Sequence, residues 1–279
     1  DSAAIESLAR TIMNGNERLV KDLATTGSCD CSYSLPEICR FRVNIYRQNG
    51  NYAMVLRRLQ TQIPSLEMLK LVPVFREIIK QKTGIIFVTG GTGSGKTTTL
   101  AALLNEINHH SEVHIVTLED PIEFLHPHVK ATFSQRELGR DFFAFPDGLR
   151  AALRQAPKII LVGEIRDGAV ADIAIQAALT GHLVFSTLHT NDAPSAVTRL
   201  IDMGVKPFLV ASSIQAIMAQ RLVRVICKNC KTIDENPDPS YLRLLDITPE
   251  DIAKTPIYKG AGCAKCQGTG FKGRQGVFE

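Results

Sequence analysis

The stretch GGTGSGKT, at residues 90–97 of this 279-residue chain, limits the possible folds more than any other feature. It fits the pattern G-x-x-x-x-G-K-[ST], follows the apolar run IIFVT and precedes the helix-forming run TTTLAALLNEI. In this strand–turn–helix context, glycines allow backbone N–H groups to surround phosphate oxygens at the positive end of a helix. The pattern predicts a phosphate-binding loop made of Gly90, Gly91, Thr92, Gly93, Ser94, Gly95, Lys96, Thr97 and Thr98.

Two side chains of this loop have predicted roles of their own. Lys96 is expected to reach the β- and γ-phosphates of a nucleotide, and Thr97 is expected to be a ligand of Mg²⁺. The alternative is a glycine-rich turn with an incidental lysine, which the complete motif in its context disfavours.

Strands and helices alternate from Gly84 onward. The expected strands are 85–89, 114–119, 159–163 and 183–188, and the expected helices are 96–109, 146–155, 168–180, 193–203 and 207–221. Such alternation predicts an α/β fold in which a mostly parallel sheet is covered by helices on both faces.

The segment before this core has a different pattern. Residues 3–26 keep the helical spacing of apolar residues and predict one or two helices. Two strands are expected within 41–59, around the turn signal Asn49-Gly50-Asn51, and 60–69 is expected to be a linker.

The segment after the core is rich in cysteine pairs, proline and glycine from about residue 224, with one helix expected at 240–254. The predicted organisation is an N-terminal domain at 1–59, the linker at 60–69, the α/β core at 70–223 and a cysteine-containing subdomain at 224–279. Because the chain begins with Asp rather than Met, we expect it to be a piece of a longer protein, truncated at both ends.

Composition excludes several classes of protein. The net charge is only +4, from 32 basic and 28 acidic residues, which argues against dedicated nucleic-acid binding. No apolar run approaches the roughly 20 residues of a membrane-spanning helix. Seven cysteines are too few and too unevenly placed for a secreted disulfide scaffold, so we expect a reducing, cytoplasmic environment.

Acidic residues follow two of the predicted strands. The segment TLEDPIE carries Glu119, Asp120 and Glu123, and the segment LVGEIRD carries Glu164. Ligands of open α/β sheets bind at the carboxyl ends of strands, and phosphoryl transfer needs a held metal ion and a positioned water. These carboxylates are therefore candidates for both tasks, although any one of them could simply be a solvated surface group. Asp167 is expected to cap the helix at 168–180.

Two histidines flank the fourth predicted strand. If 183–188 is extended, the rings of His182 and His189 lie ~23 Å apart and cannot contact one phosphate. His189, at the carboxyl end, is the candidate γ-phosphate sensor, whereas His182 is expected to have a structural or subunit-contact role.

The segments CKNC and CAKC form the spacing C-x₂-C-x₃₂-C-x₂-C. Four thiolates in two such knuckles predict a structural Zn²⁺ site with no open ligand position, made by Cys227, Cys230, Cys263 and Cys266. Reduced free thiols or a disulfide are the alternatives. The remaining cysteines, Cys29, Cys31 and Cys39, are interpreted as ordinary thiols.

Four ordered motifs resemble those of one family. The set GGTGSGKTTTL, TLEDPIE, LVGEIRD and ALTGHLVFSTLHTNDA is similar to the Walker A, Asp box, atypical Walker B and His box of the secretion ATPases of type II secretion and type IV pilus systems. RFRVN and VLRRL resemble the end of that family's N-terminal PAS-like domain, and the resemblance covers about residues 35–279. It implies a RecA-like P-loop ATPase core, preceded by part of a PAS-like α+β domain and followed by a zinc-binding subdomain.

The resemblance also implies a function and roles for particular residues. It implies a cytoplasmic hexamer, peripheral on the inner membrane, in which ATP hydrolysis does mechanical work on a platform protein of a secretion or pilus-assembly system. Glu164 would hold Mg²⁺ through water, and Glu123 would be the general base. Arg42 and Arg57, with Arg40 less firmly placed, would stabilise charge at the γ-phosphate.

The chain departs from the family pattern before its third strand. It has Ala156-Pro157-Lys158 where the family usually has Asp-Pro-Asp, so two negative charges are expected to be missing near the site. FSQRELGRD resembles the pilus-retraction branch, whereas RLIDMGVKPFLVASSI and the tetracysteine element resemble the assembly and secretion branch. The alternatives left open are a retraction ATPase, a RecA-like nucleic-acid translocase and a non-hydrolysing nucleotide switch.

Overall fold

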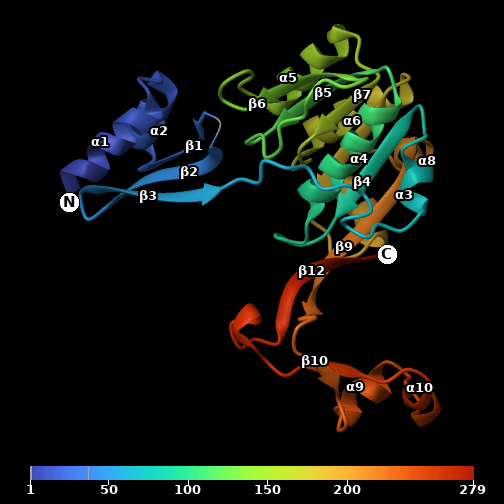
Figure 1. Cartoon of the computed structure of the whole chain (residues 1–279). Helices are drawn as coiled ribbons and strands as arrows, with labels where there is room; N and C mark the ends of the chain where they lie inside the picture. The colour runs from blue at the N-terminus through green and yellow to red at the C-terminus, as the bar shows by residue number, and fades with distance from the viewer. Residues whose placement is uncertain (1, 37) are drawn as a thin grey trace. The chain divides into compact units, whose positions relative to one another are not determined.

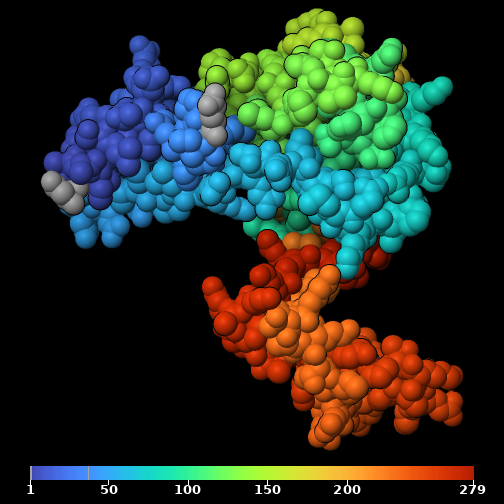
Figure 2. All heavy atoms as spheres, viewed as in Figure 1, coloured from blue at the N-terminus to red at the C-terminus, as the bar shows by residue number. Residues whose placement is uncertain are grey.

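The computed structural model describes residues 2–36 and 38–279 (Figures 1 and 2). They form two compact units: the first extends to Gln220 and includes Glu279, and the second is Arg221–Phe278. The helices of the first unit are α1 (Ser2–Met13), α2 (Glu17–Thr25), α3 (Val74–Ile78), α4 (Lys96–His110), α5 (Phe145–Ala152), α6 (Gly168–Leu179), α7 (Pro194–Asp202) and α8 (Pro207–Ser213). Its strands are β1 (Ser28–Leu35), β2 (Cys39–Gln48), β3 (Asn51–Arg58), β4 (Gly84–Thr89), β5 (His114–Glu119), β6 (Thr132–Glu137), β7 (Ile159–Val162), β8 (Leu183–Leu188) and the first part of β9 (Ile214–Ile226).

The first unit begins with two helices and a three-stranded antiparallel sheet in the order β1-β2-β3. The predicted hairpin is confirmed: Asn49 and Gly50 have φ of 48° and 76°, as a two-residue turn with both central residues left-handed requires. Helices α1 and α2 lie against this sheet (Figure 1), and their apolar residues close a small core with it. Strand β1 was not predicted because its sequence, SCDCSYSL, is too polar to show a strand pattern.

Within the first unit, the central sheet has the strand order β9-β4-β8-β7-β5-β6, and these neighbouring pairs are parallel. Every residue of β4 and of β8 is buried, which means that both faces of the sheet centre are covered. The predicted α/β fold with a mostly parallel sheet is therefore confirmed. Because these strands are parallel, their carboxyl ends all lie at one edge of the sheet, here called the carboxyl edge. This edge brings together the segments that follow β4, β5, β7 and β8.

The predicted helix at 207–221 is wrong in its second half. Helix α8 ends at Ser213, and the chain from Ile214 continues as β9, which pairs with β4. As a strand, this segment satisfies its backbone hydrogen-bonding groups by pairing with the fully buried strand β4, whereas a helix would satisfy them internally. The contact with β4 therefore outweighs the helical spacing of the sequence. Strand β6 was also missed because TFSQRE is polar, as an edge strand of a sheet can be.

The second unit contains β10 (Lys231–Ile233), α9 (Pro239–Leu244), α10 (Pro249–Lys254), β11 (Tyr258–Gly260) and β12 (Phe271–Phe278). The single helix predicted at 240–254 is wrong: Asp246 is left-handed, with φ of 52°, and separates α9 from α10. Thr248 then starts α10 with a capping box to Asp251, which gives the second helix its own beginning. No helix in 2–36 or 38–279 has the length and hydropathy to cross a membrane.

Candidate nucleotide-binding site

The phosphate loop lies between β4 and α4, as predicted. Gly90, Gly93 and Gly95 have φ of 139°, 78° and 93°, conformations that disfavour other residues. A Cβ on Gly90 would lie 2.4 Å from the backbone oxygen of Gln220, so only glycine allows the loop this close to β9. The loop backbone is thereby held against the sheet at the start of a 15-residue helix.

Lys96 is buried at the first position of α4. Its Nζ donates to the carbonyl oxygens of Gly90, at 2.8 Å, and Gly91, at 3.0 Å, so the ammonium group lies across the mouth of the loop. Burial lowers the pKa of Lys96, while the charge of nearby Glu164 opposes this shift. The buried hydroxyl of Ser94 has no hydrogen-bond partner within the described residues. An ammonium group, an unpaired hydroxyl and turn N–H groups form a donor set that fits nucleotide phosphates.

Glu164 follows β7 and therefore lies at the same edge of the sheet as the phosphate loop, which follows β4. Its carboxylate forms an ion pair with Arg166, and its Oε2 lies 3.2 Å from Nε2 of His189. Burial raises the pKa of Glu164, but the hydrogen bonds and charges of Arg166 and His189 outweigh it and hold the pKa below its ordinary value. The structure thus joins two predicted site residues, and it adds Arg166, for which no role was predicted.

The two histidines lie at opposite ends of β8, as the sequence predicts. His182 precedes β8, and its Nδ1 is 3.0 Å from the carbonyl oxygen of Ala177 at the end of α6. His189 follows the same strand at the opposite end. Asp167 caps α6 as predicted, accepting a hydrogen bond from the N–H of Val170 at 2.9 Å.

The acidic segment after β5 contains one deeply buried carboxyl, Glu119. It accepts hydrogen bonds from Thr117 Oγ1, at 2.7 Å, and Gln135 Nε2, at 3.3 Å. Burial raises the pKa of Glu119 to about 7, and the negative charge of Glu123 acts in the same direction. The half-buried side chain of Glu123 has no hydrogen bond or ion pair within 2–36 and 38–279, so its carboxylate is available to another molecule.

Glu119→Gln should change how stability depends on pH. Because the pKa of Glu119 is about 7 in the folded state against an ordinary 4.5, its stabilising contribution is complete below pH 4.5 and is lost as the pH rises through 7. The two values correspond to on the order of 3 kcal/mol. Denaturant unfolding should show the variant gaining stability over the wild type between pH 5 and pH 8, whereas Glu112→Gln, an exposed control, should not. Parallel pH profiles for wild type and Glu119→Gln would contradict the assignment.

The predicted arginines lie on the N-terminal sheet. Arg42 on β2 and Arg57 on β3 are directly opposite each other in the register. Partial burial raises the pKa of Asp120, and the charge of Arg42 lowers it, so Arg42 lies near the acidic segment. Arg57 is exposed. Arg40 is instead paired with Glu137, with its Nη2 3.9 Å from Oε2.

The expectation that the altered segment Ala156-Pro157-Lys158 lies near the site is wrong. It precedes β7, whereas Gly163 and Glu164 follow that strand. Lys158 lines a pocket with residues from the amino ends of β4 and β8. Ala156 and Lys158, the two positions without the expected negative charge, therefore lie at the edge of the sheet away from the phosphate loop.

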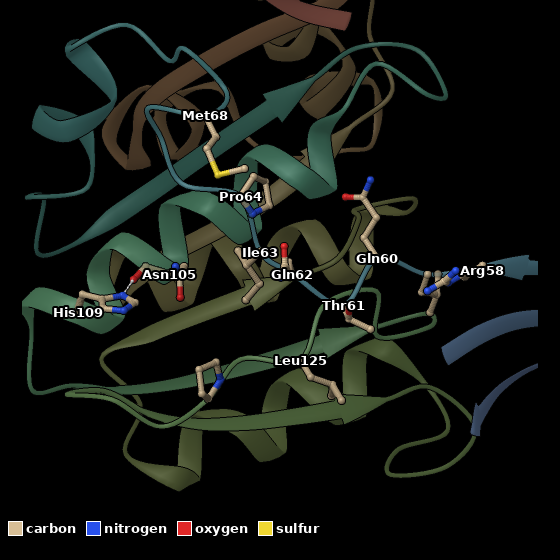
Figure 3. Close-up of a pocket in the computed structure, with 12 residues that line it drawn as sticks. Arg58, Gln60, Thr61, Gln62, Ile63, Pro64, Met68, Asn105, His109 and Leu125 are labelled. Atoms are coloured by element: carbon tan, nitrogen blue, oxygen red, sulfur yellow. Dashed lines mark hydrogen bonds between the residues drawn. The ribbon is translucent and has the colours of Figure 1, made fainter. Parts of the chain in front are cut away.

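The predicted linker lines a pocket of about 790 Å³ (Figure 3). Gln60 to Pro64 form one wall, and Asn105 and His109 of α4 form another. The rest of the lining is Arg58, Leu59, Met68, Leu125 and Pro127. Asn105 and His109 belong to the second half of α4, whereas the phosphate loop meets its first residue. The linker, the second half of α4 and the segment that follows Glu123 thus line the pocket. The phosphate loop is not among the lining residues.

The four predicted zinc ligands form one cluster in the second unit. Their sulfur atoms all lie within 4.8 Å of one another. The Sγ–Sγ distances are 3.9 Å for Cys227–Cys263, 3.8 Å for Cys230–Cys266 and 3.7 Å for Cys263–Cys266. A tetrahedron with Zn–S bonds of about 2.3 Å has edges of roughly 3.8 Å, so the donor set fits zinc. The sulfur atoms are too far apart for disulfides, and all four residues are free cysteines.

A glycine-rich phosphate loop, acidic residues after two neighbouring parallel strands and a histidine beside the second of them define a P-loop nucleotide-binding protein. A family model described as "Type II/IV secretion system protein" matches residues 32–279, and the chain belongs to this family. The resemblance drawn from the four motifs is therefore confirmed.

Individual relatives agree with this assignment. The type IV pilus assembly ATPase PilB of Thermus thermophilus is 44% identical over 230 residues, covering 81% of this chain and 25% of PilB. The type II secretion system ATPase E of Vibrio cholerae is 49% identical over 214 residues, covering 74% of this chain and 39% of that protein. The crystal structure of the pilus retraction motor PilT with bound ADP has a TM-score of 0.75 at 40% identity, covering 80% of this chain and 66% of that one. The chain thus spans less than half of the two curated relatives.

Proposed function

We propose that this chain is the catalytic part of an ATPase motor that drives type II secretion or type IV pilus assembly. The observation that supports it best is the grouping of Lys96, Glu164 and His189 at the carboxyl edge of the sheet, beside the phosphate loop. Relatives named as pilus assembly and type II secretion ATPases share this core. ATP and Mg²⁺ are the proposed cofactors of the first unit.

The proposed roles follow from the chemistry of phosphoryl transfer. Lys96 and the loop N–H groups bind the β- and γ-phosphates, and Thr97 and Glu164 would hold Mg²⁺, Glu164 through water. When bound, Mg²⁺ neutralises charge on the phosphate oxygens. His189, held by Glu164, senses the γ-phosphate, and Arg42 and Arg57 stabilise the charge that develops during transfer.

The two glutamates of the acidic segment are the candidates for accepting the proton of the attacking water. Glu119 is buried and its carboxylate is bound by Thr117 and Gln135, which makes it a poor acceptor for a water outside the core. Glu123 is half-buried and has no partner within the described ranges. We therefore assign the general base to Glu123.

Glu123→Gln tests this assignment. The variant should lower kcat for ATP hydrolysis by about 10²–10⁴-fold because the amide cannot accept the proton. Affinity for a fluorescent ADP analogue should stay within about twofold, since Glu123 does not hold phosphate. The exposed Glu112 supplies a matched control, Glu112→Gln, which should retain wild-type turnover. Loss of nucleotide affinity in the Glu123 variant would show that the residue supports the site rather than acting as the base.

The remaining proposals concern the assembly around this chain. We propose that it works as a hexamer, through a platform protein at the inner membrane, and that Cys227, Cys230, Cys263 and Cys266 hold a structural zinc ion. The tetracysteine cluster favours the assembly and secretion branch. Similarity to the structure of PilT keeps pilus retraction as the second candidate. Deletion of the gene in the source organism distinguishes the two: loss of pili or of secretion supports the proposal, whereas excess unretracted pili would support retraction.

A further inference from the structure

The polar edge strand β6 holds the turn that carries Glu123. Gln135 accepts from the N–H of His126 and donates to the carbonyl oxygen of Phe124, both at 2.8 Å. Glu137 Oε2 accepts from the N–H of Ile122 at 3.1 Å. Two residues apart on one strand, Gln135 and Glu137 lie on the same face. Together they bind the backbone on both sides of Glu123.

Glu137 also contacts the N-terminal sheet of the first unit. Its Oε1 accepts a hydrogen bond from Ser32 Oγ of β1 at 2.7 Å, and Arg40 Nη2 of β2 lies 3.9 Å from its Oε2. The side chain of Arg18, on α2, packs against Gly139 in the turn that follows β6. A Cβ on Gly139 would lie 2.3 Å from Cζ of Arg18. One carboxylate thus joins two strands of the N-terminal sheet to the turn around Glu123.

The burial of this carboxylate makes the connection sensitive to its partners. Glu137 is only 6% exposed, and the charge of a buried carboxylate requires hydrogen bonds and a cation. If Ser32 and Arg40 moved away, the carboxylate would keep the backbone N–H of Ile122 but lose the hydroxyl of Ser32 and the guanidinium group of Arg40. Reorienting Glu137 toward water would then release the Ile122 N–H and loosen the turn.

We propose that Glu137 is a positioning residue that couples the N-terminal sheet to the general base, so that Glu123 is correctly placed only while Ser32 and Arg40 contact Glu137. This inference rests on the proposed ATPase activity. It gives a role to the segment SQRE, at residues 134–137. The roles proposed for the phosphate loop, the acidic segment and His189 do not involve this segment. Its consequence is that hydrolysis depends on the N-terminal sheet through a group that does not touch the nucleotide.

A double-mutant cycle on the full chain tests the coupling. Ser32→Ala, Arg40→Met and Glu137→Gln should each lower kcat by about 5- to 20-fold with little change in the affinity for the ADP analogue. Combining Glu137→Gln with either N-terminal variant should lower kcat no further than the stronger single change, because both remove one connection. Arg47→Met, on the same strand as Arg40 but exposed, is the matched control and should leave kcat unchanged.

Hydrogen exchange supplies a measurement that does not depend on turnover. Exchange of the Ile122 amide should speed up in Glu137→Gln, Ser32→Ala and Arg40→Met and stay at the wild-type rate in Arg47→Met. Multiplicative kcat effects would show that Arg40 and Glu137 act independently, and unchanged exchange at Ile122 would equally overturn the coupling. Lys96→Ala distinguishes failure of the coupling from failure of the proposed function. A wild-type protein no more active than Lys96→Ala would refute the ATPase activity. An active wild-type protein whose Glu137 variants hydrolyse ATP at the same rate would refute only the coupling.

Discussion

Lys96→Ala should lower kcat for ATP hydrolysis by about 10³-fold or more. The ammonium group is buried and held across the phosphate loop by the carbonyl oxygens of Gly90 and Gly91, so it needs little reorganisation to meet phosphate oxygens. Removing it leaves the charge on the transferring phosphoryl group without its fixed cation. Phosphate release and affinity for the ADP analogue, measured on the same samples, separate catalysis from binding, and both should fall.

The control for this variant is Lys82→Ala, which removes an exposed lysine shortly before β4, on the amino side of that strand. Its turnover should equal that of the wild type. Glu164→Ala should also nearly abolish hydrolysis, and it should raise the Mg²⁺ concentration needed for any residual activity. Wild-type rates in both Lys96→Ala and Glu164→Ala would mean that the site lies elsewhere.

Removing the proposed zinc should unfold the second unit. Within Arg221–Phe278, the buried residues are Cys227, Cys266 and Gly270, so this unit has almost no apolar core of its own. Units of this size without a core need a metal or other cross-link, and structural zinc supplies about 10–16 kcal/mol in small zinc domains. Chelation, or Cys266→Ser, should therefore abolish protection from proteolysis and hydrogen exchange in residues 224–279.

Metal analysis of the purified chain is the direct measurement, and it should give one zinc ion per chain. Cys31→Ser is the matched control because Cys31 lies in the N-terminal sheet, outside the cluster, and its replacement should leave the zinc content unchanged. Protein with no metal, four reactive thiols and a protected second unit would remove the zinc proposal.

Edge and partner strands were the least predictable part of the fold. The segments that became β1 and β6 are polar, and the segment that became the start of β9 keeps helical spacing. What makes each of them a strand is a neighbour distant in the sequence, such as β4 for β9. Local propensity carries no information about such a neighbour.

The parts of this protein that depend on local chemistry follow from its amino-acid pattern alone. The phosphate loop, the N-cap at Asp167, the hairpin turn and the cysteine knuckles need particular residues at fixed spacings, and all of them lie where they were predicted. Which polar groups meet across the sheet follows instead from the three-dimensional fold. It buried Glu119, paired Glu164 with His189 and Arg166, and placed Glu137 between Ile122 and the N-terminal strands, because parallel strands bring distant segments to one edge.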